Sequence, residues 1–165
     1  MPKLLKNGVI VDNDWTLMAK DAEGPIPEGA VIVPLSLWLE HRTALLQRPD
    51  TGVWLDSDET PEQLPAEDIA QLPLIAVNFP VFTDGRGFTS ARLLRERYDF
   101  RGELRAVGYF LAEQVCYLHR CGVNAFDFGS ERAQHLPAAQ EALQDFTEYY
   151  QGAVDQPLPL FRRRA

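Results

Sequence analysis

The segment from Asn78 to Arg97 holds the residues of this chain best suited to chemistry. An apolar run that ends at Val77 is typical of a buried strand; two glycines follow, and then a helical pattern begins. A helix start behind a glycine loop favours an anion, because its first N–H groups lack partners and its dipole is positive there. The candidate ligand-binding residues are Asn78, Asp84, Gly85, Arg86 and Gly87 in the loop, and Arg92 in the helix that follows.

The loop residues have separable expected roles. Gly85 or Gly87 would permit positive φ and close approach of the backbone. Asp84 could orient Arg86 or accept a hydrogen bond at the helix start, and Arg86 could contact an anion with two N–H groups. The pattern leaves three interpretations open: a glycine turn braced by an Asp–Arg pair, an anion or ligand site, and a surface for a partner protein.

Cofactor and metal motifs are incomplete. Gly85 to Ser90 differs from the dinucleotide-binding fingerprint at one position, where Ser90 replaces a glycine or alanine. No acidic residue ends the next apolar run, where one would bind the ribose. The three histidines lack metal-ligand spacing. Cys116 and Cys121 form neither a CxxC pair nor a disulfide framework, so we expect packed, inert thiols. We predict no cofactor and no metal site.

Charge and hydropathy limit which classes of partner and which cellular location we expect. The net charge of −8 argues against a nucleic-acid partner. No apolar run reaches the roughly 20 residues of a membrane helix, and the first residues lack a signal-peptide core, so we expect a cytoplasmic protein without a membrane partner. Acids gather in residues 50–68 and arginines in residues 84–105. They form either a solvated surface or a bipolar one that steers an anion or a partner to the arginines.

Apolar runs and helical patterns alternate along the chain at intervals of roughly 20–30 residues, which is typical of parallel α/β proteins. We predict one α/β domain over residues 1–165, with about five βα units in a parallel sheet, either open and doubly wound or a half-barrel. The expected strands are Ala30–Val33, Val53–Leu55, Leu74–Val77, Leu104–Val107 and Ala125–Phe128, and the expected helices are Leu35–Gln47, a short one from Pro61, Phe88–Tyr98, Tyr109–Cys121 and Pro137–Tyr150.

The two ends of the chain are expected to differ from this core. Val9–Val11 and Trp15–Leu17 flank a turn at Asp12–Asp14, which predicts an N-terminal β-hairpin within residues 1–22. Prolines precede the last residues, so we expect a flexible tail over residues 156–165.

Two blocks carry a family resemblance. Asn78-Phe-Pro with Thr83-Asp-Gly-Arg-Gly-Phe88, and Gly102-Glu-Leu-Arg-Ala-Val-Gly108, resemble a bacterial family of unknown function whose members are often labelled "oxidoreductase probably involved in sulfite reduction". The resemblance covers about residues 30–128. It implies a role beside the sulfite reductase haemoprotein, but it supplies no catalytic residues, and Tyr109 stands where the motif often has Asp.

We therefore expect an accessory protein of assimilatory sulfite reduction. It would bind a small oxyanion or a redox partner, the sulfite reductase haemoprotein by resemblance. The alternatives are a stand-alone enzyme acting on a phosphorylated or sulfonated small molecule, and an NAD(P)H-dependent oxidoreductase. Whether the chain is an enzyme stays open, because the oxidoreductase label comes from the resemblance alone.

Overall fold

A single curled sheet organises the molecule. The computed structural model describes residues 1–22 and 24–163. Within them the strands are β1 (Lys3–Lys6), β2 (Val9–Asp12), β3 (Thr16–Leu17), β4 (Val31–Pro34), β5 (Thr51–Leu55), β6 (Leu74–Phe79), β7 (Glu103–Gly108) and β8 (Ala125–Phe126). Their order across the sheet is β2-β1-β8-β7-β6-β5-β4-β3.

Helices fill the connections between the strands. They are α1 (Leu35–Leu45), α2 (Ala66–Gln71), α3 (Arg86–Glu96), α4 (Val115–Arg120), α5 (Leu136–Ala142) and α6 (Leu160–Arg163), with short 3-10 turns η1 (Pro61–Gln63), η2 (Ala112–Gln114) and η3 (Ser130–His135). No helix in this part of the chain is both long and apolar enough to cross a membrane.

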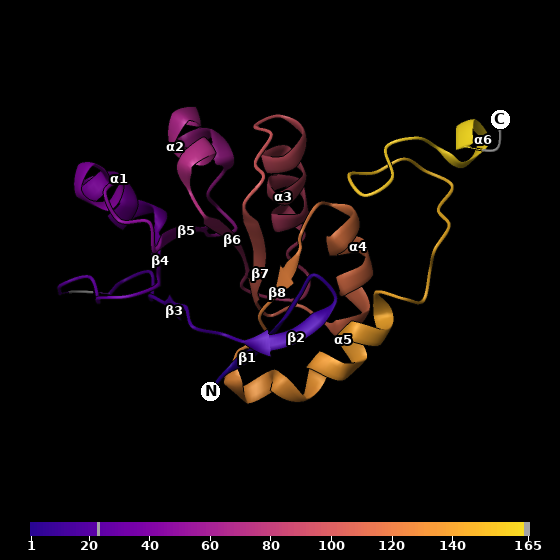
Figure 1. Ribbon diagram of the computed structural model, residues 1–165, viewed down its shortest axis with the longest axis horizontal. Helices are drawn as coiled ribbons and strands as arrows, with labels where there is room; N and C mark the ends of the chain where they lie inside the picture. The colour runs from indigo at the N-terminus through magenta and orange to yellow at the C-terminus, as the bar shows by residue number, and fades with distance from the viewer. Residues whose placement is uncertain (23, 164–165) are drawn as a thin grey trace.

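The sheet is a half-barrel, which decides between the two architectures left open by the sequence. Strands β3 to β8 are parallel and lie side by side in chain order, without the reversal that defines a doubly wound sheet. Because crossovers between parallel strands are right-handed, strands added in one direction place their helices on one face. Figure 1 shows α1, α2, α3 and α4 together on that face.

The two faces of the sheet bury different sets of side chains. The helix face holds the main core, in which alternate residues such as Val53, Ile75, Val77 and Leu104 are almost fully buried. The opposite, concave face holds a smaller apolar cluster with Trp15 packed against it. The members of that cluster are Ile32, Trp54, Leu74, Ala76 and Val107.

The N-terminal hairpin is present, but its strands are not those predicted. Strand β1 pairs antiparallel with β2, and the turn between them is Asn7-Gly8, where both residues have positive φ. This is the dipeptide that two-residue hairpin turns prefer. The expected pairing of Val9–Val11 with Trp15–Leu17 is wrong, because β3 instead pairs in parallel with β4 at the far edge of the sheet.

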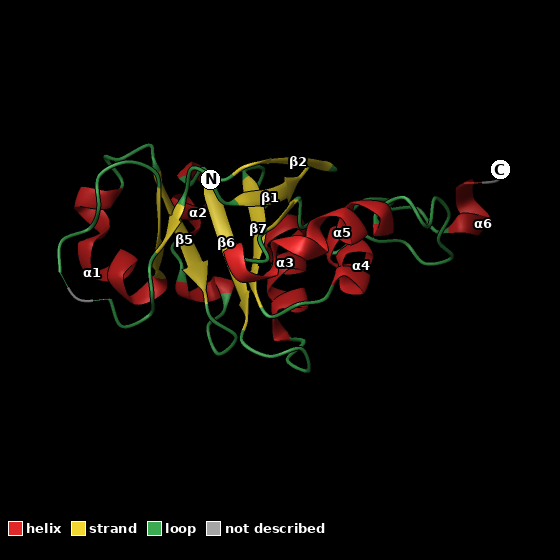
Figure 2. Cartoon of the chain, turned by 90° about the horizontal axis from the view of Figure 1, so that it is seen from below, coloured by secondary structure: helices red, strands yellow, loops and turns green. Residues whose placement is uncertain are grey.

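The N-terminal residues therefore supply both edges of the sheet. Strand β1 pairs with β8 on one side, and β3 pairs with β4 on the other. Three residues, Asn13 to Trp15, join β2 to β3, and such a link spans at most about 14 Å. The sheet must curl strongly to bring its two edges this close, and in Figure 2 the hairpin lies across the end of the parallel strands.

The C-terminal third departs most from expectation. The predicted helix Pro137–Tyr150 ends at Ala142, because its later aromatic residues find nothing to pack against: Phe146 and Tyr150 are exposed. Of the tail expected over residues 156–165, Leu160–Arg163 forms a helical turn, and residues 164–165 lie outside the described residues. The predicted helix Tyr109–Cys121 is shorter, with η2 followed by α4, but Gly122 ends it with positive φ as expected.

Candidate functional site

Parallel strands collect their loops at the carboxyl edge of the sheet, so the predicted β6–α3 loop lies there beside the loop after β5. The Asp84 carboxylate accepts hydrogen bonds from the Arg86 Nε at 2.9 Å and Nη2 at 2.6 Å. It also accepts one from the backbone N–H of Arg86 at 3.2 Å. The Arg86 Nη2 also donates to the Ser57 Oγ at 3.0 Å. Asp84 therefore both orients Arg86 and accepts at the helix start, as the sequence predicted.

This pairing sets the electrostatics of the loop. Hydrogen bonds from Arg86 hold the pKa of the Asp84 carboxyl well below its usual range, against a smaller opposing effect of burial. The same interaction raises the pKa of the Arg86 guanidinium. A carboxylate of the chain itself thus occupies the place that an anion would take at the start of α3.

Asn78 belongs to a neighbouring network at the same edge. Its Nδ2 donates to the Asp56 Oδ1 at 2.9 Å, and Lys20, which follows β3, lies 2.6 Å from the Asp56 Oδ2 and 3.2 Å from the Asp58 Oδ1. Burial opposes ionisation of Asp56, but the hydrogen bonds from Lys20, Asn78 and the Ser57 N–H hold its pKa below the usual range. The hydrogen bond to Asp56 is the main cause of the raised pKa of Lys20.

The two loop glycines have different roles from those expected. Neither uses positive φ: Gly85 caps α3 at φ −88°, and Gly87 lies in the first turn of the helix. Close approach does hold for Gly87, although to a side chain of the core. A Cβ at Gly87 would lie 2.7 Å from the Phe79 Cζ, whereas one at Gly85 would meet nothing nearer than 3.9 Å.

We expect Gly87→Ala to lower the free energy of unfolding by about 1–3 kcal/mol, because the added methyl must displace the Phe79 ring within the core. Gly85→Ala is the matched control and should change stability by no more than about 0.5 kcal/mol. Chemical denaturation of both variants measures the difference. Equal effects at the two positions would show that contact with Phe79 does not decide the outcome.

The arginines of residues 84–105 do not form the free basic surface that the bipolar interpretation requires. Arg92 lies further along α3 and pairs with Glu96 at 2.9 Å, so the structure does not bring it to the loop. Arg95 donates to the backbone carbonyls of Phe100, Gly102 and Gly122. The remaining pairs are Arg86–Asp84, Arg97–Glu62, Arg101–Asp99 and Arg105–Glu103.

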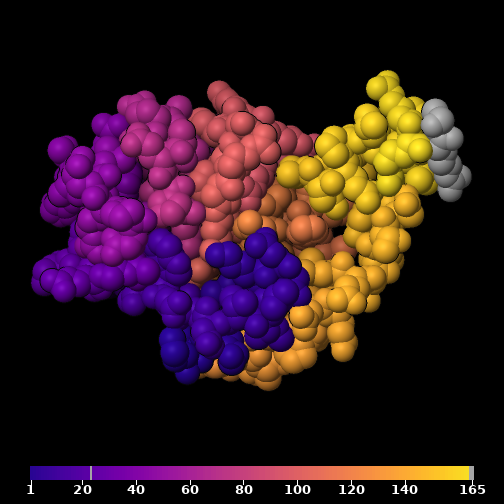
Figure 3. Space-filling view, in the orientation of Figure 1, coloured from indigo at the N-terminus to yellow at the C-terminus, as the bar shows by residue number. Residues whose placement is uncertain are grey.

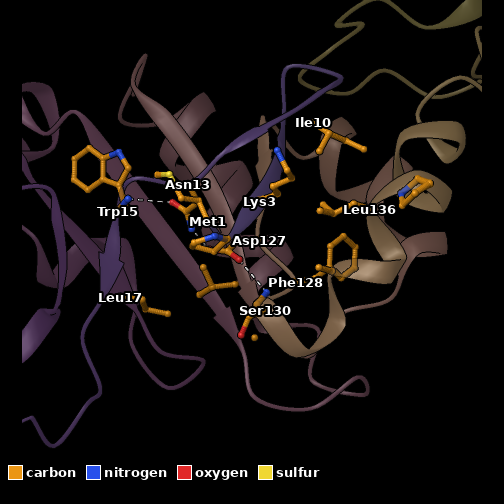
Figure 4. A pocket seen from close by; sticks show the side chains of 16 residues that line it. Met1, Lys3, Ile10, Asn13, Trp15, Leu17, Asp127, Phe128, Ser130 and Leu136 are labelled. Atoms are coloured by element: carbon orange, nitrogen blue, oxygen red, sulfur yellow. Dashed lines mark hydrogen bonds between the residues drawn. The ribbon is translucent and has the colours of Figure 1, made fainter.

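A cavity of about 910 Å³ lies beside this edge, where β7 and β8 end and the N-terminal segment crosses the concave face. Figure 4 shows Trp15 and Leu17 on one side of it, Phe128 and Leu136 on the other, and Asp127 between them. Sequence reasoning did not select these residues as a site. The one available signal was Asp127, an acid inside the expected strand Ala125–Phe128, which in the structure directly follows β8 (Ala125–Phe126).

Charged side chains lie beneath the cavity. Arg105 is 1% exposed and donates to Glu103 from Nε at 2.7 Å and to the Asn13 Oδ1 from Nη1 at 3.0 Å. Asn13 in turn donates to the Asp127 Oδ2 at 2.8 Å, and Lys6 pairs with Glu103 at 2.7 Å. Residues from β1, the β2–β3 link, β7 and the end of β8 thus form one connected network.

The cysteines and the possible metal ligands do not form a further site. Burial raises the pKa of the Cys121 thiol, and the Cys116 sulfur lies 3.0 Å from the Tyr149 hydroxyl. Among the described residues, no three His, Cys, Asp or Glu side chains are grouped to hold a metal ion.

The chain after α5 leaves the body of the molecule as a C-terminal arm, residues 143–163 (Figures 1 and 3). Arg120 of α4 anchors it, with its guanidinium 3.9 Å from the centre of the Tyr149 ring and its Nη2 donating to the Gln151 carbonyl at 2.6 Å. Large apolar side chains on this arm are exposed to solvent: Phe146, Tyr150, Leu158 and Phe161.

Comparison with known proteins places the chain. A family model described as bacterial protein of unknown function (DUF934) matches residues 52–161. The chain belongs to this family. The match begins after the expected residue 30 and extends beyond residue 128, so it includes the loops after β5 and β6, Asp127 and nearly all of the C-terminal arm. No curated protein and no solved structure matches the chain at a significant level.

Proposed function

We propose that this protein is a cytoplasmic accessory protein of assimilatory sulfite reduction that acts by binding a redox partner, the sulfite reductase haemoprotein. The resemblance of the Asn78–Phe88 and Gly102–Gly108 blocks supplies the pathway and the partner. The C-terminal arm supplies the structural support, since it extends from the body of the molecule and leaves several large apolar side chains exposed.

The exposed aromatic residues of the arm carry this proposal. Phe146, Tyr150 and Phe161 are 62, 70 and 64% exposed. Exposing them costs hydrophobic free energy that a partner would recover, and aromatic residues commonly dominate binding energy at protein interfaces. Because the family match runs to residue 161, the arm belongs to the sequence shared by the family.

Binding of an oxyanion at the β6–α3 loop has weaker support. Lys20 and Arg86 are the cations of the two networks at this loop, and each is already paired with a carboxylate at 2.6 Å. An incoming sulfite or phosphate would have to displace Asp84 or Asp56 from its partner. The same pairing weakens the alternative of an enzyme acting on a phosphorylated or sulfonated substrate. The close approach of Gly87 is to the core side chain of Phe79, so this glycine gives no support to a dinucleotide site.

The partner proposal predicts that the triple variant Phe146→Ser/Tyr150→Ser/Phe161→Ser weakens the complex with the haemoprotein of the same organism by at least about tenfold. The loss should come mainly from faster dissociation, because removed anchors shorten the life of a formed complex. Surface-plasmon resonance with the purified proteins measures both rates.

The matched control is Leu39→Ser, an exposed apolar residue on α1 at the opposite end of the molecule (Figure 1). It should leave the affinity unchanged. Unaltered affinity of the triple variant would exclude the arm as the contact. Absence of any complex, together with normal growth of a deletion strain on sulfate as sole sulfur source, would contradict the accessory role itself.

A further inference from the structure

We infer that the cavity between the N-terminal segment and the ends of β7 and β8 binds a small aromatic molecule that carries a protonated amine. The inference is independent of the partner proposal. It rests on the position of the cavity, on its apolar walls and on the charge at its floor.

The position and size of the cavity are those of a ligand site. Its volume of about 910 Å³ lies within the roughly 300–1,000 Å³ typical of small-molecule pockets. It also lies where parallel strands end, which is where α/β folds gather their ligands. Both sheet edges contribute to it through the short Asn13–Trp15 link, so its walls come from a tightly connected part of the fold.

The walls favour a flat apolar body. Ile10, Val107, Phe128 and Leu136 line the cavity, and Trp15 extends the apolar surface on the opposite side (Figure 4). Aromatic and aliphatic walls recover hydrophobic free energy from an apolar ring that enters between them.

The floor favours a positive charge. Asp127 has 13% of its side chain exposed, and its hydrogen bonds come from neutral donors: the Asn13 Nδ2 at 2.8 Å and the Gly129 N–H at 2.9 Å. Among the described residues its ion-pair contact is the Arg105 Nη1, 3.7 Å away, whereas Glu103 holds both Arg105 at 2.6 Å and Lys6 at 2.7 Å. Lys3 also lines the cavity, but it is paired with Asp12 at 2.8 Å.

The cation nearest to Asp127 is thus committed mainly to Glu103. A carboxylate accepts about four hydrogen bonds, so Asp127 retains capacity for an incoming donor. A protonated amine at the cavity floor would supply the close opposite charge that a partly buried carboxylate favours. An anionic ligand would meet repulsion at the same point.

Three probes of one shape test the inference: tryptamine, its alcohol analogue tryptophol, and indole-3-propionate. Titration calorimetry and saturation-transfer NMR on the full chain should show tryptamine binding at least about tenfold more tightly than tryptophol, and indole-3-propionate most weakly, because a charged hydrogen bond adds that much affinity.

Asp127→Asn should remove the advantage of tryptamine over tryptophol. The matched control is Asp14→Asn, which removes the same charge from an exposed residue of the Asn13–Trp15 link that does not line the cavity. It should preserve the advantage. Leu17→Trp, at the half-exposed cavity wall, should weaken all three probes without unfolding the chain.

Equal binding of the three probes, preference for indole-3-propionate, or no binding at millimolar concentration would each overturn the inference. Loss of tryptamine preference in Asp14→Asn to the same extent as in Asp127→Asn would also overturn it, because the effect would then be one of overall charge. Melting curves of each variant distinguish a lost site from a lost fold.

Discussion

Arg105→Met is expected to lower the free energy of unfolding by about 3–5 kcal/mol, the usual cost of removing one partner from a buried ion pair. The methionine fills much of the volume of the arginine stem, but Glu103 loses its two short hydrogen bonds from Arg105 and keeps only Lys6 as an ionic partner. The Asn13 Oδ1 keeps only the Trp15 N–H as a donor. Both groups are at most 9% exposed, so water cannot fully replace what they lose. Urea denaturation monitored by circular dichroism measures the change.

A control variant and a double variant show whether the buried network causes this loss. Arg101→Met removes an arginine whose side chain is 83% exposed and which pairs with exposed Asp99, so it should cost less than about 1 kcal/mol. Combining Arg105→Met with Glu103→Leu should recover part of the loss, because the buried Glu103 carboxylate, left with Lys6 as its one ionic partner, is removed as well. A single-variant effect as small as that of Arg101→Met would show that the network contributes little to stability.

Asp68→Asn should give the second large loss, about 2–3 kcal/mol at pH 7. The Asp68 side chain is fully buried and accepts hydrogen bonds from the Trp38 Nε1 at 3.1 Å and from the Arg42 Nε and Nη2 at 2.7 and 2.6 Å. Asparagine has one acceptor oxygen for these three donors and no charge to pair with Arg42. The variant therefore weakens the contact between Arg42 of α1 and residue 68 of α2.

The pH dependence of this loss has a defined sign. Burial opposes ionisation of Asp68, but Arg42 and Trp38 hold its pKa below the usual range in the folded state. The stabilisation is therefore complete above the unfolded pKa of about 4 and disappears as the pH falls through the lower folded value. The difference in stability between the natural chain and Asp68→Asn should shrink with acidification over that range.

Glu67→Gln is the control for Asp68→Asn. Glu67 contacts the same arginine at 2.9 Å, but its side chain is 69% exposed, so its removal should cost only a few tenths of a kcal/mol. Similar losses at the two positions would mean that burial of Asp68 is not what gives the interaction its strength.

Much of the parallel core could be predicted from the sequence. Buried parallel strands are continuous apolar runs, and those ending near Leu55, Val77 and Val107 coincide with β5, β6 and β7. The predicted helix at Pro137–Tyr150 was too long, because a periodic pattern of apolar residues does not reveal whether a surface exists for the last turns to cover. Phe146 and Tyr150 remain 62 and 70% exposed.

The pairing of the N-terminal residues could not be predicted in the same way. Asn7-Gly8 is a local signal that would have placed the hairpin, since both residues accept positive φ. Nothing in Trp15–Leu17 indicates an edge position beside β4, because a two-residue strand acquires its partner from the curvature of the whole sheet.

In the candidate sites, too, contacts between residues close in sequence could be predicted and contacts between distant residues could not. Asp84 and Arg86 are two residues apart, so their pairing follows from local geometry and was predictable. Asn13, Arg105 and Asp127 are far apart in the chain and meet only because the sheet curls. Their contacts are a product of topology, which the spacing of residue types does not encode.

The pairing of β1 with β8 also has a consequence during synthesis on the ribosome. The N-terminal residues emerge first, yet β1 must wait for its neighbour β8, which is the last of the described strands in the sequence. Pairing of such distant segments is slow because the intervening loop must be closed first. Until β8 emerges, an incomplete sheet presents unpaired edge groups that other chains can join. The nascent protein thus depends on its last strand to protect its first.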